Sequence, residues 1–297
     1  MPERKPILIA PTRMTIASIG KYHVLGTLGQ GAHSTILHIR RSADAKPYAL
    51  KVVPIEKKDD KKYLDQVKLE FRVGQLLDHP NLIKIYTLET ESDWLFRIKK
   101  AFLLIEFVNG KTVDLIGKLQ LSHLVQIFLK TADALVHCHR KGVCHADLKP
   151  NNIMLSKQGE VKIIDYGLAW IRGQPKGRIQ GTPEYIAPET ARSSLVNEKT
   201  DIYNLGATMY RLVTGKLPPT LLAEGLPIDA KTFSGLLRPV KLHNPRAPTA
   251  LCDLIEHCLA FNPAARPARM SEVQGSLDVL AEQLVKSPKD KLEAVEW

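Results

Sequence analysis

A glycine-containing turn is the first segment of the sequence whose residue types suggest chemistry. It reads Gly29-Gln30-Gly31-Ala32-His33-Ser34 and follows an apolar stretch. Glycines let a turn lie against phosphate groups and expose its backbone N–H donors to them, so this turn is a candidate phosphate cradle. Ser34 stands where a dinucleotide-binding turn carries its third glycine, and a strand pattern follows instead of a helix. The turn alone is therefore a weak signal.

Lys51 is the second candidate, because it lies on an apolar strand pattern directly after Ala49 and Leu50. A charge in an apolar environment needs a partner or a ligand, and Glu70 on the following helix pattern is the natural partner. The alternative stays open at this point, since a lysine on a strand commonly extends its ammonium group into solvent.

Three motifs further along the chain give a much more specific signal. Residues 144–152 read CHADLKPNN, the triplet Asp165-Tyr166-Gly167 begins thirteen residues after Asn152, and residues 181–189 read GTPEYIAPE. In this order and at this spacing the motifs resemble those of the protein kinase family, over about residues 20–285. The domain is similar in style to bacterial serine/threonine kinases of eukaryotic type.

The resemblance implies an α+β fold with two lobes: a small antiparallel β-sheet lobe with one regulatory helix, and a larger helical lobe. It also implies a serine/threonine protein kinase, which transfers the γ-phosphoryl group of ATP to a Ser or Thr hydroxyl of a protein substrate. Asp147 would orient that hydroxyl and accept its proton, and Lys149 belongs to the serine/threonine-specific form of this motif. Lys51 would hold the α and β phosphates and pair with Glu70.

The resemblance places the nucleotide between the lobes. Asn152 and Asp165 would bind Mg²⁺, with Mn²⁺ as a substitute, because carboxylate and amide oxygens suit a hard cation. Ile105 would be the gatekeeper residue, and the backbone from Glu106 to Val108 would meet the adenine edge. The ATP-binding residues implied in this way are Leu28, Gly29, Gln30, Gly31, Ala32, His33, Ser34, Ile36, Ala49, Lys51, Ile105, Glu106, Val108 and Met154.

Four further residues take roles from the same resemblance. Thr182, in the GTPEYIAPE motif, would belong to the activation segment and to serine/threonine specificity. Asp201 would anchor the catalytic loop from below. Glu189 and Arg266 would form a buried ion pair that supports the fold and takes no part in catalysis.

Two departures from the family pattern concern regulation. Ala146 stands where many kinases carry an arginine that helps to bind a phosphorylated activation segment. Between residues 167 and 181 the chain reads LAWIRGQPKGRIQ, without Ser, Thr or Tyr. We therefore hypothesise that activity does not require phosphorylation of this stretch, and that Arg172, Lys176 and Arg178 give it a basic character.

A third departure concerns the apolar stack that the family builds through both lobes, here Ile85, Gly74, Tyr166 and His145. Gly74 replaces a bulky residue and is expected to leave a gap in its helix. The hydroxyl of Tyr166, which replaces the usual Phe, would fill part of that gap or reach toward the helix. The alternative is a loosely held helix that swings Glu70 outward.

The elements that must position these residues follow from hydrophobic periodicity. A strand-rich region with one helix precedes a region of longer amphipathic helices, and the change falls near Asn109-Gly110. The expected strands are residues 22–28, 35–40, 48–53, 82–88 and 102–107, and the expected helices are residues 61–77, 121–140, 200–214, 249–260 and 271–285.

These elements suggest an N-terminal extension over residues 1–18 and a kinase domain over residues 19–285. The N-lobe would cover residues 19–108 and the C-lobe residues 109–285. Residues 286–297 are expected to be a solvated C-terminal tail.

The 297 residues carry a formal charge of +11, with 44% hydrophobic residues. The basic excess is spread along the chain: residues 1–110 hold 18 basic and 12 acidic side chains. No basic run interleaved with aromatics occurs, so we expect no nucleic-acid partner. No apolar stretch reaches the roughly 20 residues of a membrane span. Four cysteines without a CxxC pattern argue against a metal site or a disulfide framework, and Cys138 and Cys258, which lie in apolar helical patterns, are expected to be reduced and buried in a cytoplasmic protein. The oligomeric state is not readable from these patterns.

Two other functions compete with an active protein kinase. A pseudokinase that binds nucleotide or partners without catalysis is favoured by Ser34, Ala146, Gly74 and Tyr166. A kinase of small molecules on a related fold would share the HxD motif and the metal-binding Asp, but it would lack GTPEYIAPE and the partner of its glutamate, Arg266.

Overall fold

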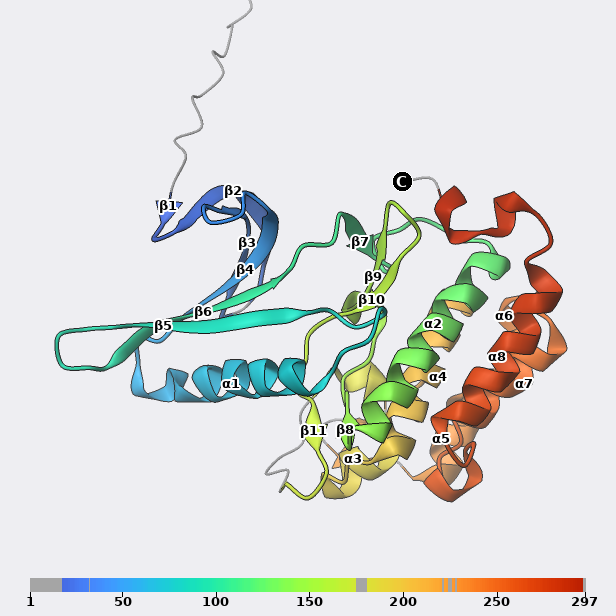
Figure 1. Cartoon of the computed structure of the whole chain (residues 1–297). Coiled ribbons are helices and arrows are strands. Elements are labelled where there is room, and N and C mark those ends of the chain that lie inside the picture. The colour runs from blue at the N-terminus through green and yellow to red at the C-terminus, as the bar shows by residue number, and fades with distance from the viewer. Residues whose placement is uncertain are drawn as a thin grey trace, which may run out of the picture.

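The computed structural model describes residues 18–31, 33–174, 181–220, 222–223, 226–227 and 229–295. Ala32, Lys176, Arg178 and all but the last residue of the expected N-terminal extension lie outside the described residues. The described chain forms two lobes (Figure 1), and the predicted α+β, bilobal architecture is confirmed.

The N-terminal lobe is built on one antiparallel sheet in the order β1-β2-β3-β4-β6-β5. Its strands are β1 (Ser18–Ile19), β2 (Tyr22–Gln30), β3 (Thr35–Arg41), β4 (Pro47–Pro54), β5 (Ile85–Ser92) and β6 (Ile98–Glu106). Successive side chains of a strand face opposite sides. On β6, Phe102 and Leu104 therefore join an outer apolar cluster, whereas Ala101 and Leu103 join the main core, which also holds residues of helix α1 (Lys61–Leu76).

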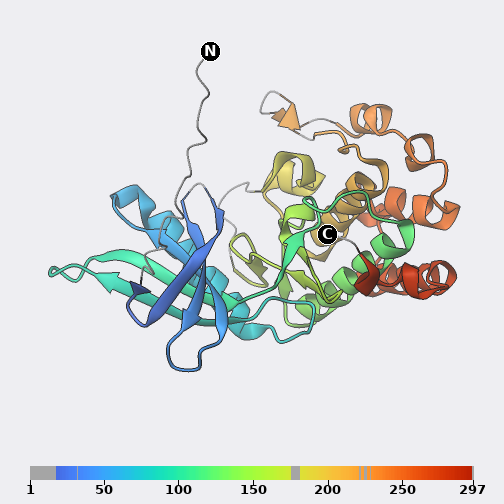
Figure 2. The same cartoon turned by 90° about the horizontal axis from the view of Figure 1, so that it is seen from above.

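The C-terminal lobe is mainly helical, and Figure 2 shows it beside the sheet lobe. Its longest helices, α2 and α4, are buried along most of their length, because apolar residues occupy more than one face. The helices are α2 (Leu121–Arg140), α3 (Pro188–Ser193), α4 (Glu198–Thr214), α5 (Ala230–Leu236), α6 (Val240–His243), α7 (Thr249–Cys258) and α8 (Met270–Leu284). The part of the chain that the structure describes contains no helix long and apolar enough to cross a bilayer.

Short strands between the lobes hold the loops of the candidate site. They are β7 (Gly110–Thr112), β8 (Val143–Cys144), β9 (Ile153–Ser156), β10 (Val161–Ile163) and β11 (Trp170–Ile171), and β12 (Leu222–Ala223) pairs with β13 (Leu226–Pro227) elsewhere. Short 3₁₀ turns cover Lys58–Asp60, Pro150–Asn152, Pro183–Tyr185, Pro263–Ala265, Pro288–Asp290 and Leu292–Ala294. The loop between β8 and β9 carries the CHADLKPNN motif.

Most long elements occur where periodicity predicts them, and the helix expected at residues 121–140 has those bounds. The strand expected at residues 82–88 lies instead at Ile85–Ser92. Leu82 lies outside this strand. It forms a parallel bridge with Ile163 of β10 and so joins the two lobes.

The C-terminal segment, expected to be a solvated tail, is exposed at residues 286–289, 291, 293 and 294, but two of its apolar residues are buried. Leu292 and Val295 are buried in the main core. The ring Nε2 of His123, on α2, lies 2.9 Å from the backbone oxygen of Lys289. These two buried side chains and the contact with His123 attach the segment to the C-lobe.

The expected gap at Gly74 is also absent, because Ile85 fills it. A Cβ placed on Gly74 would lie 2.7 Å from the Cβ of Ile85. The hydroxyl of Tyr166 takes another partner: it donates to the backbone oxygen of Ile83, at 3.0 Å. The glycine thus allows α1 to pack closely against β5, and the helix that carries Glu70 is held in place.

Substituting Gly74 tests this close packing. Gly74→Ala should destabilise the fold by about 1–3 kcal/mol, because the added methyl group overpacks against Ile85. The matched control is Gly275→Ala on α8, where nothing lies within 4 Å of the added carbon; it should stabilise by about 0.4–1 kcal/mol. Urea unfolding followed by circular dichroism measures both, and equal stabilisation of the two variants would contradict the packing.

Candidate active site

The catalytic loop between β8 and β9 is held by a carboxylate of α4. Asp201 is fully buried and accepts hydrogen bonds from the backbone N–H groups of His145, at 2.9 Å, and Ala146, at 2.8 Å. The ring Nε2 of His139, on α2, lies 2.8 Å from the same carboxylate. Burial alone would raise the pKa of Asp201, but the hydrogen bonds and the neighbouring histidines hold that pKa below its usual value. A charged Asp201 therefore fixes two consecutive residues of the loop.

Two residues of the site have left-handed backbone conformations. The φ angles are 65° at Ala146 and 68° at Asp165. Such a conformation is unfavourable for residues with a Cβ and persists when surrounding contacts enforce it. At Ala146 one such contact is the hydrogen bond to Asp201, and its effect is to turn the chain immediately before Asp147.

Asp147 lies at the centre of a polar cluster that joins two distant motifs. Its Oδ2 accepts from Lys149 Nζ at 2.7 Å, and its Oδ1 accepts from the backbone N–H of Thr182 at 3.1 Å. Lys149 Nζ also donates to the Thr182 hydroxyl, at 2.6 Å. The side chain of Asn152 donates to the backbone oxygen of Asp147, at 2.8 Å. The structure thus brings together the predicted residues Asp147, Lys149, Asn152 and Thr182.

Lys51 and Glu70 form a buried ion pair, with 2.7 Å between Nζ and Oε2. The Oδ1 of Asp165 lies 3.9 Å from the same ammonium group. Burial opposes the charge on Lys51, but the two carboxylates outweigh it and raise the pKa of this lysine. The protein atoms around Asp165 partly desolvate its carboxylate, which would raise its pKa although the side chain stays 45% exposed, but the Lys51 cation together with the Gly167 N–H lowers that pKa. Lys51 therefore meets partners from α1 and from the Asp165-Tyr166-Gly167 motif instead of solvent.

The donor set of Asn152 and Asp165 fits a hard divalent cation. Asp165 is held ionised, and its side chain is 45% exposed, so a ligand can reach it. Asn152 is buried and oriented by its bond to Asp147. A carboxylate and an amide oxygen are ligands that Mg²⁺ accepts, together with phosphate oxygens.

The predicted nucleotide residues lie on one continuous part of the N-lobe and the lobe junction. Ile36 on β3 pairs with Lys51, and Ala49 on β4 pairs with Ile105 on β6. The turn between β2 and β3 closes through the Gly31 N–H, which donates to the Ser34 backbone oxygen at 2.8 Å. The remaining described members are Leu28, Gly29 and Gln30 on β2, His33 in the turn, Glu106 on β6, Val108 after it and Met154 on β9.

Two of these side chains have partners that the sequence did not indicate. The ring of His33 stacks on Tyr63 of α1, with 3.8 Å between centroids. Glu106 contacts Lys162 of β10, at 2.9 Å, and accepts from the Lys84 N–H, at 3.0 Å. The side chain of Glu106 therefore links the lobes, and its backbone N–H is occupied as well, since it donates to the Lys84 oxygen at 2.9 Å.

Glu189 and Arg266 form a bidentate ion pair with bonds of 2.9 and 2.8 Å. Both side chains are buried, and the guanidinium also donates to the backbone oxygens of Lys199 and Ala260. Its carbon lies 5.0 Å from the ring centroid of Tyr203. The pair connects α3 to the turn before α8.

His139 and Trp170 are the residues around the catalytic loop that sequence reasoning missed. His139 lies in an apolar helix pattern. The only feature of the sequence that could have placed it near the catalytic loop is its separation of eight residues from Asp147. Trp170 lies between Ala169 and Ile171. The predictions for this segment concerned only its basic residues and its lack of hydroxyl groups.

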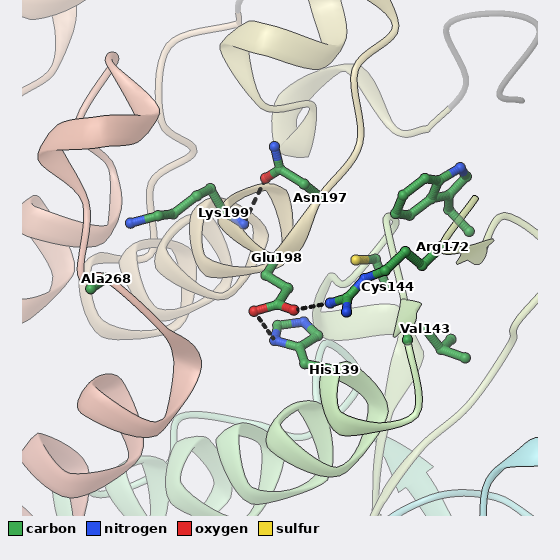
Figure 3. A pocket seen from close by; sticks show the side chains of 10 residues that line it. His139, Val143, Cys144, Arg172, Asn197, Glu198, Lys199 and Ala268 are labelled. Carbon is green, nitrogen blue, oxygen red and sulfur yellow. Dashed lines mark hydrogen bonds and ion pairs between the residues drawn. The ribbon is translucent and has the colours of Figure 1, made fainter. Parts of the chain in front are cut away.

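A cavity of about 270 Å³ lies beside this loop, lined by residues that include His139, Cys144, Arg172 and Glu198 (Figure 3). His139, Cys144 and Asp201 also lie close enough to suggest a metal site. The contacts argue against one, because the Asp201 oxygens already have three partners, and burial raises the pKa of the Cys144 thiol. All four cysteines are buried, which for Cys138 and Cys258 agrees with the helical apolar patterns around them.

Comparison with known proteins identifies the family. The model of the family described as "Protein kinase domain" matches residues 22–285, and the chain therefore belongs to the protein kinase family. Similar curated proteins are the serine/threonine-protein kinase PrkC of Bacillus subtilis, 25% identical over 87% of this chain and 40% of that protein, and the CBL-interacting protein kinase 8 of Oryza sativa subsp. japonica, 31% identical over 86% and 56%. The serine/threonine-protein kinase PknA of Mycobacterium tuberculosis is 29% identical over 86% of this chain and 60% of that protein. The chain thus spans about half the length of these relatives.

The buried ion pair supports a stability prediction. Arg266→Met should lower the free energy of unfolding by about 3–5 kcal/mol, because it leaves the Glu189 charge buried and unpaired. Adding Glu189→Gln should restore part of that loss.

The control is Arg269→Met. Arg269 belongs to an exposed pair with Glu272, at 3.5 Å, and its removal should change stability by no more than about 1 kcal/mol. Denaturant unfolding measures all variants, and an equal small effect at both arginines would contradict a supporting role for the buried pair.

Proposed function

We propose that this chain is an ATP-dependent serine/threonine protein kinase with Asp147 as its catalytic base. The observation that carries the proposal is the pairing of two assembled clusters across the lobe junction. Asp147 is bonded to Lys149 and Thr182, and Lys51 is bonded to Glu70. The names of the similar curated proteins support the serine/threonine class.

In this proposal the chain's own groups position the reactants and stabilise charge. Asp147 orients the substrate hydroxyl and accepts its proton as the new oxygen–phosphorus bond forms. Lys149, which lies 2.7 Å from that carboxylate, supplies positive charge beside the transferred group. Lys51 contacts the α and β phosphates, and Glu70 keeps its ammonium group in place.

Asn152 and Asp165 would hold Mg²⁺, with Mn²⁺ as a substitute. When bound, the metal would neutralise charge on the phosphate groups. The fit rests on the oxygen donors of the two residues and on the lowered pKa of Asp165, which keeps that carboxylate ionised.

The protein substrate would lie along a cavity of about 860 Å³ next to the catalytic loop. The cavity is lined by Asn151, Glu184 and Tyr185, which are close in sequence to Asp147 or Thr182. It is also lined by Arg211 of α4. Asp114 also lines the cavity and accepts from the Asn151 amide, at 2.6 Å. Charged side chains of both signs face this cavity. They therefore favour neither acidic nor basic residues beside the target hydroxyl, and the proposal specifies the substrate only as a protein chain.

The proposal includes activity without phosphorylation of the activation segment. Residues 168–174, the part of this segment that follows Gly167 and is described, contain no Ser, Thr or Tyr. Lys51 and Glu70 are paired in the unmodified chain. The four free, buried cysteines suit a reducing compartment, which supports a cytoplasmic location.

Residues that differ from the family pattern have contacts that argue against the pseudokinase alternative. Ile85 fills the space at Gly74, and Tyr166 is buried with its hydroxyl bonded, so neither substitution loosens the helix of Glu70. The backbone N–H of Ala146 is held by Asp201.

Transfer of radiolabel from [γ-³²P]ATP to a generic protein substrate tests the proposal. The phosphatase-treated chain should label Ser or Thr with Mg²⁺ or Mn²⁺, and chelation with EDTA should abolish labelling. Asp147→Asn should lower the rate by about a hundredfold or more, because it removes the base. Lys51→Met should do the same through lost phosphate contacts.

Equal labelling by the wild type and both variants would indicate a contaminating kinase. Absence of labelling with retained ATP binding would favour a pseudokinase. Activity that disappears on phosphatase treatment, with a phosphate mapped to Thr182 or its neighbours, would contradict the independence from phosphorylation.

A further inference from the structure

The segment after Asp165 is attached to the catalytic loop by a short backbone ladder. Trp170 and Ile171 of β11 pair with Cys144 and Val143 of β8. The Arg172 N–H extends the ladder by donating to the Gly142 oxygen, at 2.8 Å. These contacts bring Trp170 beside the start of the motif that contains Asp147.

The side chain of Trp170 completes an apolar cluster at this point. The cluster consists of Cys144, Ala146 and Val196, all buried, with Trp170 packed against them. The indole Nε1–H donates to the Gln174 backbone oxygen, at 2.7 Å, which fixes the orientation of the ring. Three separate parts of the chain therefore meet here: β8 with the catalytic loop that follows it, the residues before α4, and β11.

Ala146 is the critical member of this cluster, because it directly precedes Asp147. Its N–H is held by Asp201, and its backbone has the strained φ of 65°. Trp170 packs against the apolar group to which Ala146 belongs. The strained turn that directs Asp147 is thus fixed by a hydrogen bond and by apolar packing together.

We propose that Trp170 is a positioning residue that ties the activation segment to the catalytic loop through its contact with the Ala146 cluster. The inference rests on the proposed kinase function and adds how that site is kept assembled. The tie is made of apolar contacts, the Nε1–H bond and a backbone ladder, so no covalent modification is needed to form it.

The test compares Trp170→Ala with Trp170→Phe in peptide phosphorylation kinetics. Trp170→Ala should lower kcat by about ten- to a hundredfold, because a small displacement of a catalytic group has effects of that size. Trp170→Phe, which keeps an aromatic ring but lacks the Nε1–H donor, should recover most of the rate. KM for ATP should change by no more than about twofold, since Lys51 and Glu70 are untouched.

Two further measurements separate positioning from general loss of fold. The truncated side chain of Trp170→Ala would enlarge a cavity that Trp170 already lines, so added indole should raise the rate of this variant and leave the wild type unchanged. Trp94→Ala is the matched control, because Trp94 is 84% exposed in the β5–β6 turn, and it should retain wild-type kcat.

Equal kcat for Trp170→Ala and Trp94→Ala would overturn the proposal. A loss that neither Phe nor indole restores would also overturn it, in favour of a purely structural role. If the wild type transfers no phosphate, the proposed function is wrong. Amide hydrogen exchange then tests separately whether Trp170 ties the activation segment to the catalytic loop. Faster exchange at Ala146 and Arg172 in Trp170→Ala would support it, and unchanged exchange would reject it.

Discussion

The buried carboxylate of Asp201 is the contact on which the geometry of the site depends. A buried charge is tolerated only when its oxygens are satisfied. Asp201 meets this condition through the N–H groups of His145 and Ala146 and through the ring of His139. The same bonds hold Ala146 in a left-handed conformation and so direct Asp147 toward Lys149 and toward the GTPEYIAPE motif. The buried charge of Asp201 needs hydrogen-bond donors, and this need determines the conformation of the catalytic loop.

The rest of the molecule brings the other half of the site to this fixed loop. The packing of Gly74 against Ile85 lets α1 approach the sheet closely, which places Glu70 beside Lys51. The contacts of Glu106 with Lys162 and with the N–H of Lys84 join the lobes near the predicted nucleotide site. These contacts form within the chain itself, which agrees with a site that is assembled without modification.

Sequence reasoning predicted the long elements and proposed the candidate site residues from local signals: helical periodicity at residues 121–140, and motif order for Asp147, Asn152 and Asp165. It failed where the cause lies in tertiary packing. The fit of Ile85 into the space at Gly74, the buried Leu292 in a charged tail, and the partners of Glu106 depend on segments distant in sequence. Trp170 was missed for the same reason, since its packing against the cluster of Cys144, Ala146 and Val196 exists only in the folded chain.

The most direct test of this account is the single-turnover rate of phosphoryl transfer in Asp201→Asn, measured together with the Kd for ATP. An amide can accept through only one oxygen, so the variant should lose the hold on at least one loop N–H group. The account predicts a transfer rate lower by about ten- to a hundredfold, with the Kd for ATP nearly unchanged, because Lys51 and Glu70 lie in the other lobe. An unchanged transfer rate in a folded Asp201→Asn chain would contradict the account.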